Sequence, residues 1–389
     1  MDNDHVINTF IQIALALNVA VAQRTGIEPL LSTEAYDYDL PIPDWDWEEI
    51  GRQIEKVQAE LDSLSPRRAA FLEDILQAFA LMVQEGQGQE IPYADRVATY
   101  LQVPAERVPA PVIRSLENEL RSLLVEADYP DDLAMALPQW RQRQAVQGEE
   151  LVKQGHAFLQ QARQKTHQQI WPLPSEHQVT LTFPKNYPYR GYSDYVRNYQ
   201  GHVFLNGDIS WEVAGLKHLV THESFPGHQA FSAIREQSFQ AGLLPVEGTL
   251  YFSNTPITPI VEGLCEFGQT ILGLVETIDD HIYDVYNRFC NAISTNLAFD
   301  CNADGMDRET AVLQLMHTTY VSRVFAEKYY DFFTNPLWCT SFPHYWYGTE
   351  FIRESYTNMK DDLPAFFKMV YTEPHTVQTL REAIQNYLA

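Results

Sequence analysis

Apolar residues recur at the spacing of a helix along most of the first 170 residues. Side chains three or four positions apart share one face of an α-helix, so such a series predicts a helix that packs by that face. Two clear series are Ile50, Ile54, Val57, Leu61 and Phe71, Ile75, Phe79, Met82. The pattern predicts helices over residues 6–22, 48–63, 67–84, 93–101, 110–126 and 139–169.

Capping and turn residues mark where these helices begin. The acidic, aromatic stretch 36–47 predicts a loop, from which Asp44 or Asp46 caps the next helix. Ser65 and Pro66 predict the following turn, because proline suits the first turn of a helix. Residues 1–170 are therefore expected to form a helical N-terminal region.

The pattern changes after residue 170. Residues 179–183 and 202–206 alternate with β-branched and aromatic side chains and predict two strands, joined by a tyrosine-rich loop over 186–199. A helix is expected over 211–224, capped by Asp208 or Ser210. Helical spacing returns over 230–240, 259–278, 281–299 and 308–333. The prediction is a mainly α fold, a multi-helix array with a small β-sheet next to the helix of residues 211–224. Residues 171–389 would form the chemically active region, continuous with residues 1–170 in one structural unit.

Composition narrows the class of protein. Of the 389 residues, 45% are hydrophobic and 20% charged, as in folded globular proteins. The net charge of −25 argues against nucleic acid or an anionic membrane as a partner. The four cysteines, Cys265, Cys290, Cys301 and Cys339, are too few for a disulfide framework, which favours reduced thiols and a cytoplasmic location.

The apolar N-terminal segment bears on membrane attachment. The chain begins Met1-Asp2-Asn3-Asp4, which is acidic where a secretion signal needs positive charge. Polar residues also interrupt the apolar run over 6–22, so it falls short of the roughly 18 consecutive apolar residues of a membrane span. We therefore expect a buried or amphipathic helix and no membrane segment.

The candidate chemistry centres on the heptapeptide His222-Glu223-Ser224-Phe225-Pro226-Gly227-His228. Neutral imidazole is a favoured ligand of zinc, and a carboxylate beside the metal can take a proton from its bound water. On a continuous helix, side chains at i and i+6 point roughly 120° apart. Pro226 and Gly227 predict a break in the helix that would return His228 to the face of His222. Two alternatives remain: surface histidines at a helix end, or a pair formed by His218 and His222, which share a face without any break.

A catalytic zinc site usually has three protein ligands and an open position. With His222 and His228 as two of them, Glu262 is the best candidate for the third, and Glu266 one turn later could replace it or orient a histidine. Glu223 would then be the general base.

Three further groups have competing interpretations. Tyr345, within His344-Tyr345-Trp346-Tyr347-Gly348, supplies a phenol that could stabilise an oxyanion, or else packs in an aromatic core. Asp300 and Asp304 either support the site or end a helix. Cys265 lies close in sequence to Glu262 and is expected to be a packing residue.

These motifs resemble a bacterial family catalogued as domain of unknown function 885, predicted zinc metallopeptidases related to the gluzincins. The family has H-E-x-x-P-G-H, which His222, Glu223, Pro226, Gly227 and His228 match completely. Glu262 and Gly263 match the start of its E-G-W-A-x-Y-x-E motif, which implies Glu262 as third ligand. Asp300 matches its V-D-T-G-x-H segment, and Tyr345 and Gly348 keep the spacing of its late Y-x-x-G. The resemblance covers roughly residues 200–350.

The departures lie outside the implied ligands. Leu264 stands where the family has tryptophan, Gln269 where it has a second glutamate and Asp304 where it has histidine, and the late motif is about three residues short.

The function predicted from the sequence is a zinc-dependent hydrolase, a metallopeptidase acting on short peptides. Zn2+ would be held by His222, His228 and Glu262, with Glu223 and Tyr345 catalytic. The alternatives are a zinc enzyme of the same fold repurposed for another small substrate, and a binding module in which the metal ligands are relics. The expected partner is a small peptide or another small molecule.

Overall fold

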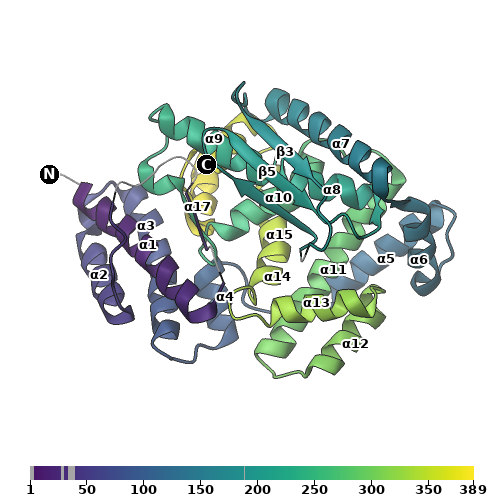
Figure 1. Ribbon diagram of the computed structural model, residues 1–389, viewed down its shortest axis with the longest axis horizontal. Coiled ribbons are helices and arrows are strands. Elements are labelled where there is room, and N and C mark those ends of the chain that lie inside the picture. Colours follow the sequence, from purple (N-terminus) through teal and green to yellow (C-terminus); the bar gives the residue numbers. More distant parts are fainter. Residues whose placement is uncertain (1–3, 28–29, 34–39, 188) are drawn as a thin grey trace. The chain divides into compact units, whose positions relative to one another are not determined.

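The computed structural model describes residues 4–27, 30–187 and 189–389, except for 34–39. The predicted loop over 36–47 therefore lies partly outside the described residues. Helices dominate, and three small sheets accompany them in the strand orders β1-β7, β2-β6 and β3-β5-β4 (Figure 1). The mainly α prediction is confirmed.

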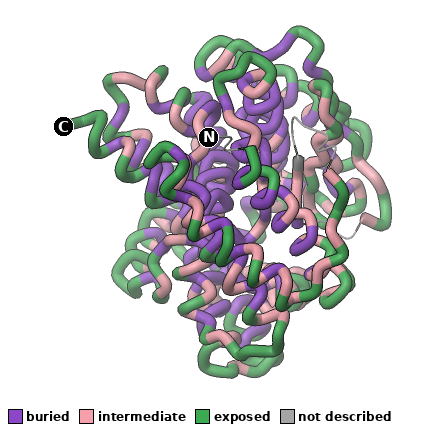
Figure 2. The backbone as a smooth tube through the Cα atoms, turned by 90° about the vertical axis from the view of Figure 1, so that its left-hand side faces the viewer, coloured by how far each residue is buried: buried purple, intermediate pink, exposed green. Residues whose placement is uncertain are grey.

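The chain forms two compact units, each built from separate segments. The first unit comprises residues 1–105, 232–260 and 351–389, and the second comprises 106–231 and 261–350. The boundary expected between residues 170 and 171 lies inside the second unit. Many helices bury one side and expose the other, as the burial colours of Figure 2 show, whereas the helices over residues 213–223 and 258–271 are buried along almost their whole length.

The first unit is a helical cluster with a two-stranded sheet. Its elements are α1 (Asp4–Thr25), β1 (Leu31–Thr33), α2 (Trp47–Glu60), η1 (Leu61–Ser63), α3 (Pro66–Gly86), α4 (Tyr93–Leu101), η2 (Val246–Thr249), β7 (Leu250–Phe252), α16 (Leu363–Thr372) and α17 (Val377–Leu388). Phe10 of α1 stacks on Phe79 of α3 with ring centroids 6.0 Å apart. Phe79 also meets Phe252 of β7 edge-on. These rings join the sheet to the helices in one apolar core.

Helix α1 is long and apolar enough to cross a membrane, judged by length and composition alone. Phe10, Ile13 and Leu17 are buried in the first unit, and 56% of the most apolar window of the helix is buried. The core helix of a globular unit can have the same length and composition. The absence of a membrane segment, expected from the sequence, therefore stays a prediction.

The second unit surrounds a long helix, α11 (Ile278–Asn302). Around it lie α5 (Ala110–Glu126), α6 (Leu133–Gln144), β2 (Ala145–Val146), α7 (Gly148–Gln169), β3 (Gln178–Thr182), β4 (Gly191–Tyr195), β5 (Gln200–Leu205), β6 (Trp211–Glu212), α8 (Val213–Glu223), α12 (Arg308–Thr319), α13 (Arg323–Phe333), α14 (Ser341–Pro343) and the π-helical turn η3 (His344–Gly348). Strand β5 lies between β3, parallel to it, and β4, antiparallel to it. Strand β4 is therefore an edge of this sheet, and it packs beside α8.

Three helices begin in one unit and end in the other: α9 (His228–Gln240), α10 (Thr258–Ile271) and α15 (Thr349–Asn358). The first turn of α9 and most of α10 belong to the second unit. The residues that carry the candidate chemistry therefore all lie in that unit.

Several predicted boundaries are confirmed. Asp46 caps α2 by accepting the Glu49 N–H at 2.8 Å, and Pro66 begins α3. Helices α4 and α5 have the predicted bounds. The strands expected at 179–183 and 202–206 are β3 and β5.

Other predictions were wrong where one residue adopts a left-handed conformation. The helix expected over 139–169 is two helices, α6 and α7, separated by β2, and α7 begins at Gly148, φ +63°. The helix expected over 308–333 breaks at Tyr320, φ 58°. Helix α10 ends at Ile271, before Gly273 at φ +61°.

Two further differences concern the sheets. The loop expected over 186–199 contains β4, whose pairing with β5 is set by tertiary contacts that composition does not reveal. Neither Asp208 nor Ser210 caps α8, because Trp211 and Glu212 first pair with β2 as strand β6.

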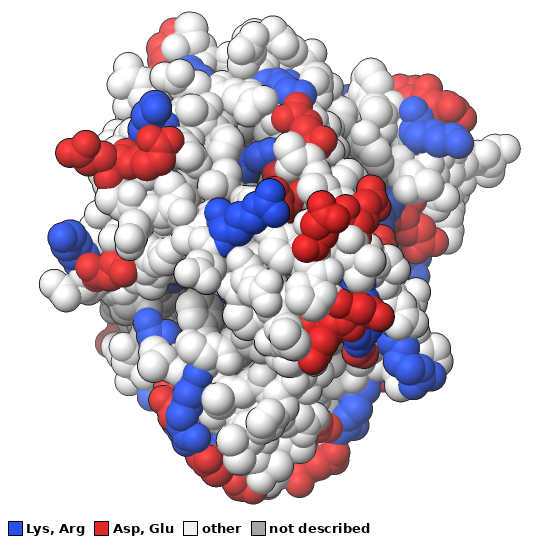
Figure 3. Space-filling view, turned by 90° about the vertical axis from the view of Figure 1, so that its right-hand side faces the viewer, with Lys and Arg blue, Asp and Glu red and all other residues white. Residues whose placement is uncertain are grey.

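Charged groups of both signs are spread over the surface. On the face drawn in Figure 3, acidic and basic side chains lie beside one another among broad uncharged areas. In the second unit, Arg308 pairs with Asp331 on an exposed surface. Exposed pairs of this kind add little stability.

Candidate metal centre

The helix break after Glu223 brings the two histidines of the heptapeptide together. Helix α8 ends at Glu223 and α9 begins at His228. The Gly227 N–H donates to the carbonyl of Thr221 at 3.2 Å, so the connecting loop folds back against α8. A Cβ atom on Gly227 would lie 1.8 Å from the carbonyl oxygen of His222, so this approach requires glycine. The predicted break is confirmed.

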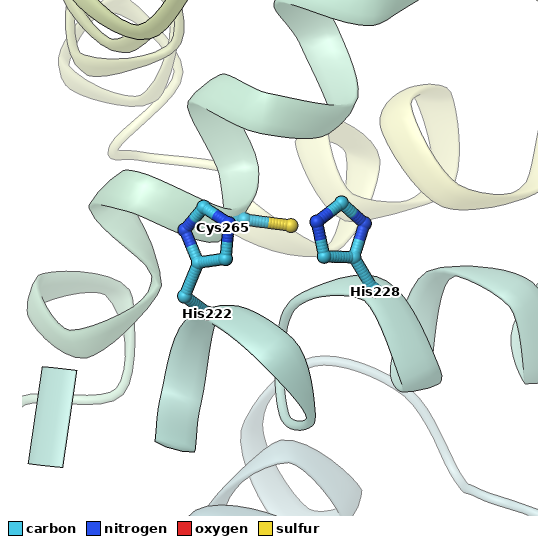
Figure 4. A group of neighbouring side chains, drawn as sticks. All are labelled: His222, His228 and Cys265. Carbon is cyan, nitrogen blue, oxygen red and sulfur yellow. The ribbon is translucent and has the colours of Figure 1, made fainter. Parts of the chain in front are cut away.

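The two imidazoles face each other across this break (Figure 4). The ring centroids of His222 and His228 are 5.1 Å apart, and the ring planes are inclined by 70°. His222 is buried and the side chain of His228 is 23% exposed. One side of the pair is therefore accessible to solvent.

Glu262 lies beside both rings. Its Oε2 is 3.5 Å from His222 Nε2, and its Oε1 is 3.8 Å from His228 Nε2. Ligands of a tetrahedral zinc ion with bonds near 2.05 Å lie about 3.4 Å from one another. Oε2 of Glu262 is buried without a hydrogen-bond partner among the described residues. A buried, unpartnered carboxylate oxygen between two ring nitrogens fits a bound cation.

Cys265, one turn along α10 from Glu262, also reaches this position. Its Sγ and ring nitrogens of His222 and His228 all lie within 4.8 Å of one another, and Figure 4 shows its side chain directed between the rings. The sequence predicted a packing residue here. Burial and the neighbouring carboxylates of Glu262 and Glu223 raise the pKa of the thiol well above its usual range. Glu262 is the better third ligand on geometry, because its Oε2 lies 3.5 Å from His222 Nε2, close to the separation of two ligands of a tetrahedral zinc ion.

Glu266 supports His222 from the other side. Its Oε1 is 3.0 Å from His222 Nδ1 and 3.5 Å from His218 Nε2. Its Oε2 accepts hydrogen bonds from Asn287 at 2.7 Å and Asn291 at 3.1 Å. A carboxylate at Nδ1 leaves Nε2 as the metal-binding atom.

The rival pair of His218 and His222 is also brought together, with Glu266 within ligand distance of both rings. This second group has less room for a cation. Glu266 already accepts from two asparagines, and the ring of His218 packs on Tyr283 at 5.4 Å. The geometry therefore favours His222, His228 and Glu262 as the ligands.

Burial and crowding shift the ionisation of these groups. Burial raises the pKa of Glu223 and of Glu262 to about 7 in each case. Burial would lower the pKa of His222, but the carboxylates around it, Glu266 foremost, raise it to about 9. Burial and the charge of His222 lower the pKa of His228 to about 3. The carboxyl groups of Glu223, Glu262 and Glu266 crowd around His222, and a divalent cation would offset their negative charge.

Glu223 lies against the edge strand of the sheet. The side chain is buried, and a Cβ atom on Gly191 of β4 would lie 2.9 Å from its Oε1. Glu223 therefore lies beside the first residue of β4, which is an edge strand of the three-stranded sheet.

Tyr345 and an unexpected histidine approach from η3. The Tyr345 ring centroid is 6.4 Å from that of His222, so the structure brings this predicted residue to the site. His344 is buried, and both its ring nitrogens lack a hydrogen-bond partner among the described residues. Burial lowers its pKa to about 3. The sequence did not predict a role for His344, although its position beside Tyr345 was a usable signal.

Asp300 and Asp304 are engaged elsewhere in the second unit. Arg107 donates from Nε to Asp300 at 2.8 Å and also pairs with Asp304. Its guanidinium is 41% exposed, so this is a surface ion pair at the end of α11. No contact among the described residues links these aspartates to the metal site, and both lie at the end of α11, as the alternative expected.

Among known proteins, the chain resembles solved structures in its fold. No protein-family model matches the chain, and no curated protein matches it. A crystal structure of a protein provisionally described as a lipoprotein, from Colwellia psychrerythraea, is similar with a TM-score of 0.61 and 14% identity. The match covers 87% of this chain and 66% of that one, slightly under two thirds of its length.

A second solved structure has the same fold. It is a protein of unknown function from Shewanella oneidensis, also provisionally described as a lipoprotein, with a TM-score of 0.57 and 14% identity. The match covers 87% of this chain and 72% of that one. At this identity the likeness concerns the fold alone.

Proposed function

We propose that the protein is a zinc-dependent hydrolase, with His222, His228 and Glu262 as metal ligands and short peptides as substrates. The observation that carries the proposal is the position of Glu262, whose two carboxylate oxygens lie 3.5 Å and 3.8 Å from the Nε2 atoms of the histidines. When bound, the ion would supply a Lewis acid that acidifies water and polarises a carbonyl group.

The protein's own groups have separate tasks around that ion. Glu266 holds His222 through Nδ1 and so aims Nε2 at the metal. Glu223 accepts a proton from the attacking water and returns it to the leaving amine. The Tyr345 hydroxyl donates to the oxygen that becomes negative as the carbonyl carbon turns tetrahedral. The free edge of β4 aligns an extended substrate by main-chain hydrogen bonds.

A structural metal site is the second candidate, and the position of Cys265 favours it. If the Cys265 sulfur joined the two histidines and Glu262, four protein ligands would close the site to water. The two candidates differ in the effect of Cys265→Ser. A hydrolase with an open position keeps its metal in this variant, whereas a closed four-ligand site loses affinity.

The decisive experiment separates metal binding from turnover. Wild type, Glu223→Gln and the surface control Glu309→Gln are loaded with zinc, and bound metal is measured together with hydrolysis of a panel of short fluorogenic peptides and small esters. We expect one zinc per chain in all three and a rate about 10²–10⁴-fold lower in Glu223→Gln alone. Full activity in Glu223→Gln, or a wild type that binds no zinc, would overturn the proposal.

A further inference from the structure

A cavity lies in the second unit, and one of the residues that line it is Asn287, which donates to Glu266. Its volume is about 230 Å³. The walls come from β6, α11, the end of α12 and the start of α13. This volume is smaller than that of typical drug-sized pockets, so it suits a ligand of modest size.

Two arginines give the cavity its charge. Arg141 and Arg190 line it together with one carboxylate, Glu212, which lies 3.6 Å from Arg141 Nε and 3.7 Å from a terminal nitrogen of Arg190. Guanidinium groups stay protonated in proteins. With two positive charges and one negative, the lining is net positive inside a chain of net charge −25.

The hydrogen bonding of the two arginines differs. Arg141 donates to the carbonyl of Tyr320 at 2.5 Å and to the hydroxyl of Tyr286, which in turn donates to the carbonyl of Thr319. The Nε–H of Arg190 is buried and has no hydrogen-bond partner in the described part of the chain. Its guanidinium is held over the ring of Trp211 at 4.8 Å. Arg190 is thus fixed in place with a donor unused, which is costly unless a ligand accepts from it.

The remaining walls mix polar residues, such as Ser210, Asn287 and Ser322, with apolar and aromatic ones. Tyr283, Tyr329, Phe325 and Leu315 face the same space as Arg190. Such a lining would surround the body of a ligand whose charged end meets the guanidinium. Arg190 can grip a carboxylate with two parallel hydrogen bonds, which makes that group the best complement.

We propose that this cavity binds a small organic acid, with its carboxylate on Arg190 and an apolar body against the rings of Tyr283 and Tyr329. The cavity shares Asn287 and Tyr283 with the support of the metal centre, because Asn287 donates to Glu266 and Tyr283 packs on His218. The acid is therefore either the carboxylate-bearing end of a substrate or a separate effector.

Binding is tested on metal-free protein with phenylacetate and its neutral counterpart phenylacetamide, by isothermal titration calorimetry. We expect saturable binding of the acid and at least about tenfold weaker binding of the amide. Arg190→Gln should weaken binding of the acid by about tenfold or more, and Arg190→Lys should weaken it less.

A second pair of variants leaves Arg190 and its packing intact. Ser210 lines the cavity and is exposed, so it tolerates a larger side chain. Ser210→Glu should weaken binding of phenylacetate through charge repulsion, whereas Ser210→Gln, of the same size, should not. No saturable binding to folded wild type, or equal binding by wild type, Arg190→Gln and Ser210→Glu, would overturn the proposal.

A competition experiment decides whether the bound acid is part of the substrate or a separate effector. It measures how phenylacetate affects cleavage of a peptide by the zinc-loaded enzyme. Competition of phenylacetate with a peptide bearing a free carboxyl end, but not with its amide, assigns the cavity to the substrate. An equal effect on both peptides assigns it to an effector. The binding measurement needs no metal, so its failure is distinct from a failure of the proposed hydrolase function.

Discussion

Replacing Glu266 by glutamine tests whether the metal centre depends on the carboxylate behind His222. The oxygen near His222 Nδ1 and the oxygen that accepts from Asn287 and Asn291 belong to one carboxylate. Glutamine has the same shape but only one oxygen. If that oxygen faces the asparagines, the NH2 group meets the Nδ1–H of His222. If the side chain flips, the NH2 group meets the two asparagine donors instead.

Either orientation sets a donor against a donor, so one support is lost. Losing the partner of a ligating histidine lowers metal affinity by about 10–100-fold, equivalent to about 1.4–2.7 kcal/mol. The assay is competition for zinc with a chromophoric chelator, with circular dichroism to confirm that Glu266→Gln is folded.

Glu309→Gln is the matched control, since Glu309 is exposed and pairs with Arg323 on the surface. Its zinc affinity should equal that of the wild type. An unchanged zinc affinity of folded Glu266→Gln would refute the role given to Glu266. Failure of the wild type to bind zinc would instead remove the metal centre itself.

Three further predictions concern the backbone and the first unit. Gly227→Ala places a methyl group against the carbonyl of His222. We expect zinc affinity, measured by chelator competition, to fall at least about tenfold. The free energy of unfolding, measured in urea, should fall by about 1–3 kcal/mol. Arg68→Met leaves the fully buried Glu247 without its two hydrogen bonds of 2.6 and 2.9 Å, which should cost about 3 kcal/mol in urea unfolding. The hydrogen bond with its neighbouring histidine and an adjacent arginine lower the pKa of Glu373 to about 2, so its stabilisation is present above about pH 4.5 and is lost as the pH falls toward 2. Glu373→Gln should remove up to about 3 kcal/mol of this pH dependence, measured by urea unfolding between pH 2 and 6.

Each of these has a control and an outcome that contradicts it. Gly51→Ala meets only Val83 at 3.5 Å and should leave zinc affinity unchanged, so an equal loss in both glycine variants would contradict the first. Arg308→Met breaks an exposed pair and should cost under about 1 kcal/mol. A similar cost for Arg68→Met would contradict the second. For Glu373→Gln, a pH profile parallel to that of wild type would be the contrary result.

The sequence predicted the helix break because its cause is local. Proline cannot continue the hydrogen bonding of a helix, and Gly227 admits the close approach of the loop to His222. The facing of His222 and His228 follows from those two residues. Glu262 could also be predicted as the third ligand, because a zinc site needs one more ligand and Glu262 is a carboxylate followed by the small residue Gly263.

Other features depended on contacts between distant segments and escaped prediction. Cys265 reaches the histidines only because α10 packs its thiol toward the break, and an isolated cysteine in a sequence does not reveal that direction. Strand β4 has the composition of a tyrosine-rich loop and becomes a strand by pairing with β5. The cavity around Arg190 combines residues from β6, α11 and α13, so no single stretch of the sequence predicts it.

At both the metal centre and the cavity around Arg190, neighbouring charged groups differ in how many hydrogen-bond partners the chain gives them. Glu266 receives two asparagine donors and the nearby imidazoles, and these hold its pKa well below its usual range despite burial. Glu262 has no such donors at Oε2, and its pKa is raised to about 7. The two acids are one turn apart on α10, yet only Glu262 has an oxygen left for a cation. By the same reasoning Arg141 donates to two backbone carbonyls and a tyrosine hydroxyl, whereas the Nε–H of Arg190 has no partner among the described residues. Each site therefore contains a buried polar atom, Oε2 of Glu262 or Nε of Arg190, that a bound ion or ligand would satisfy.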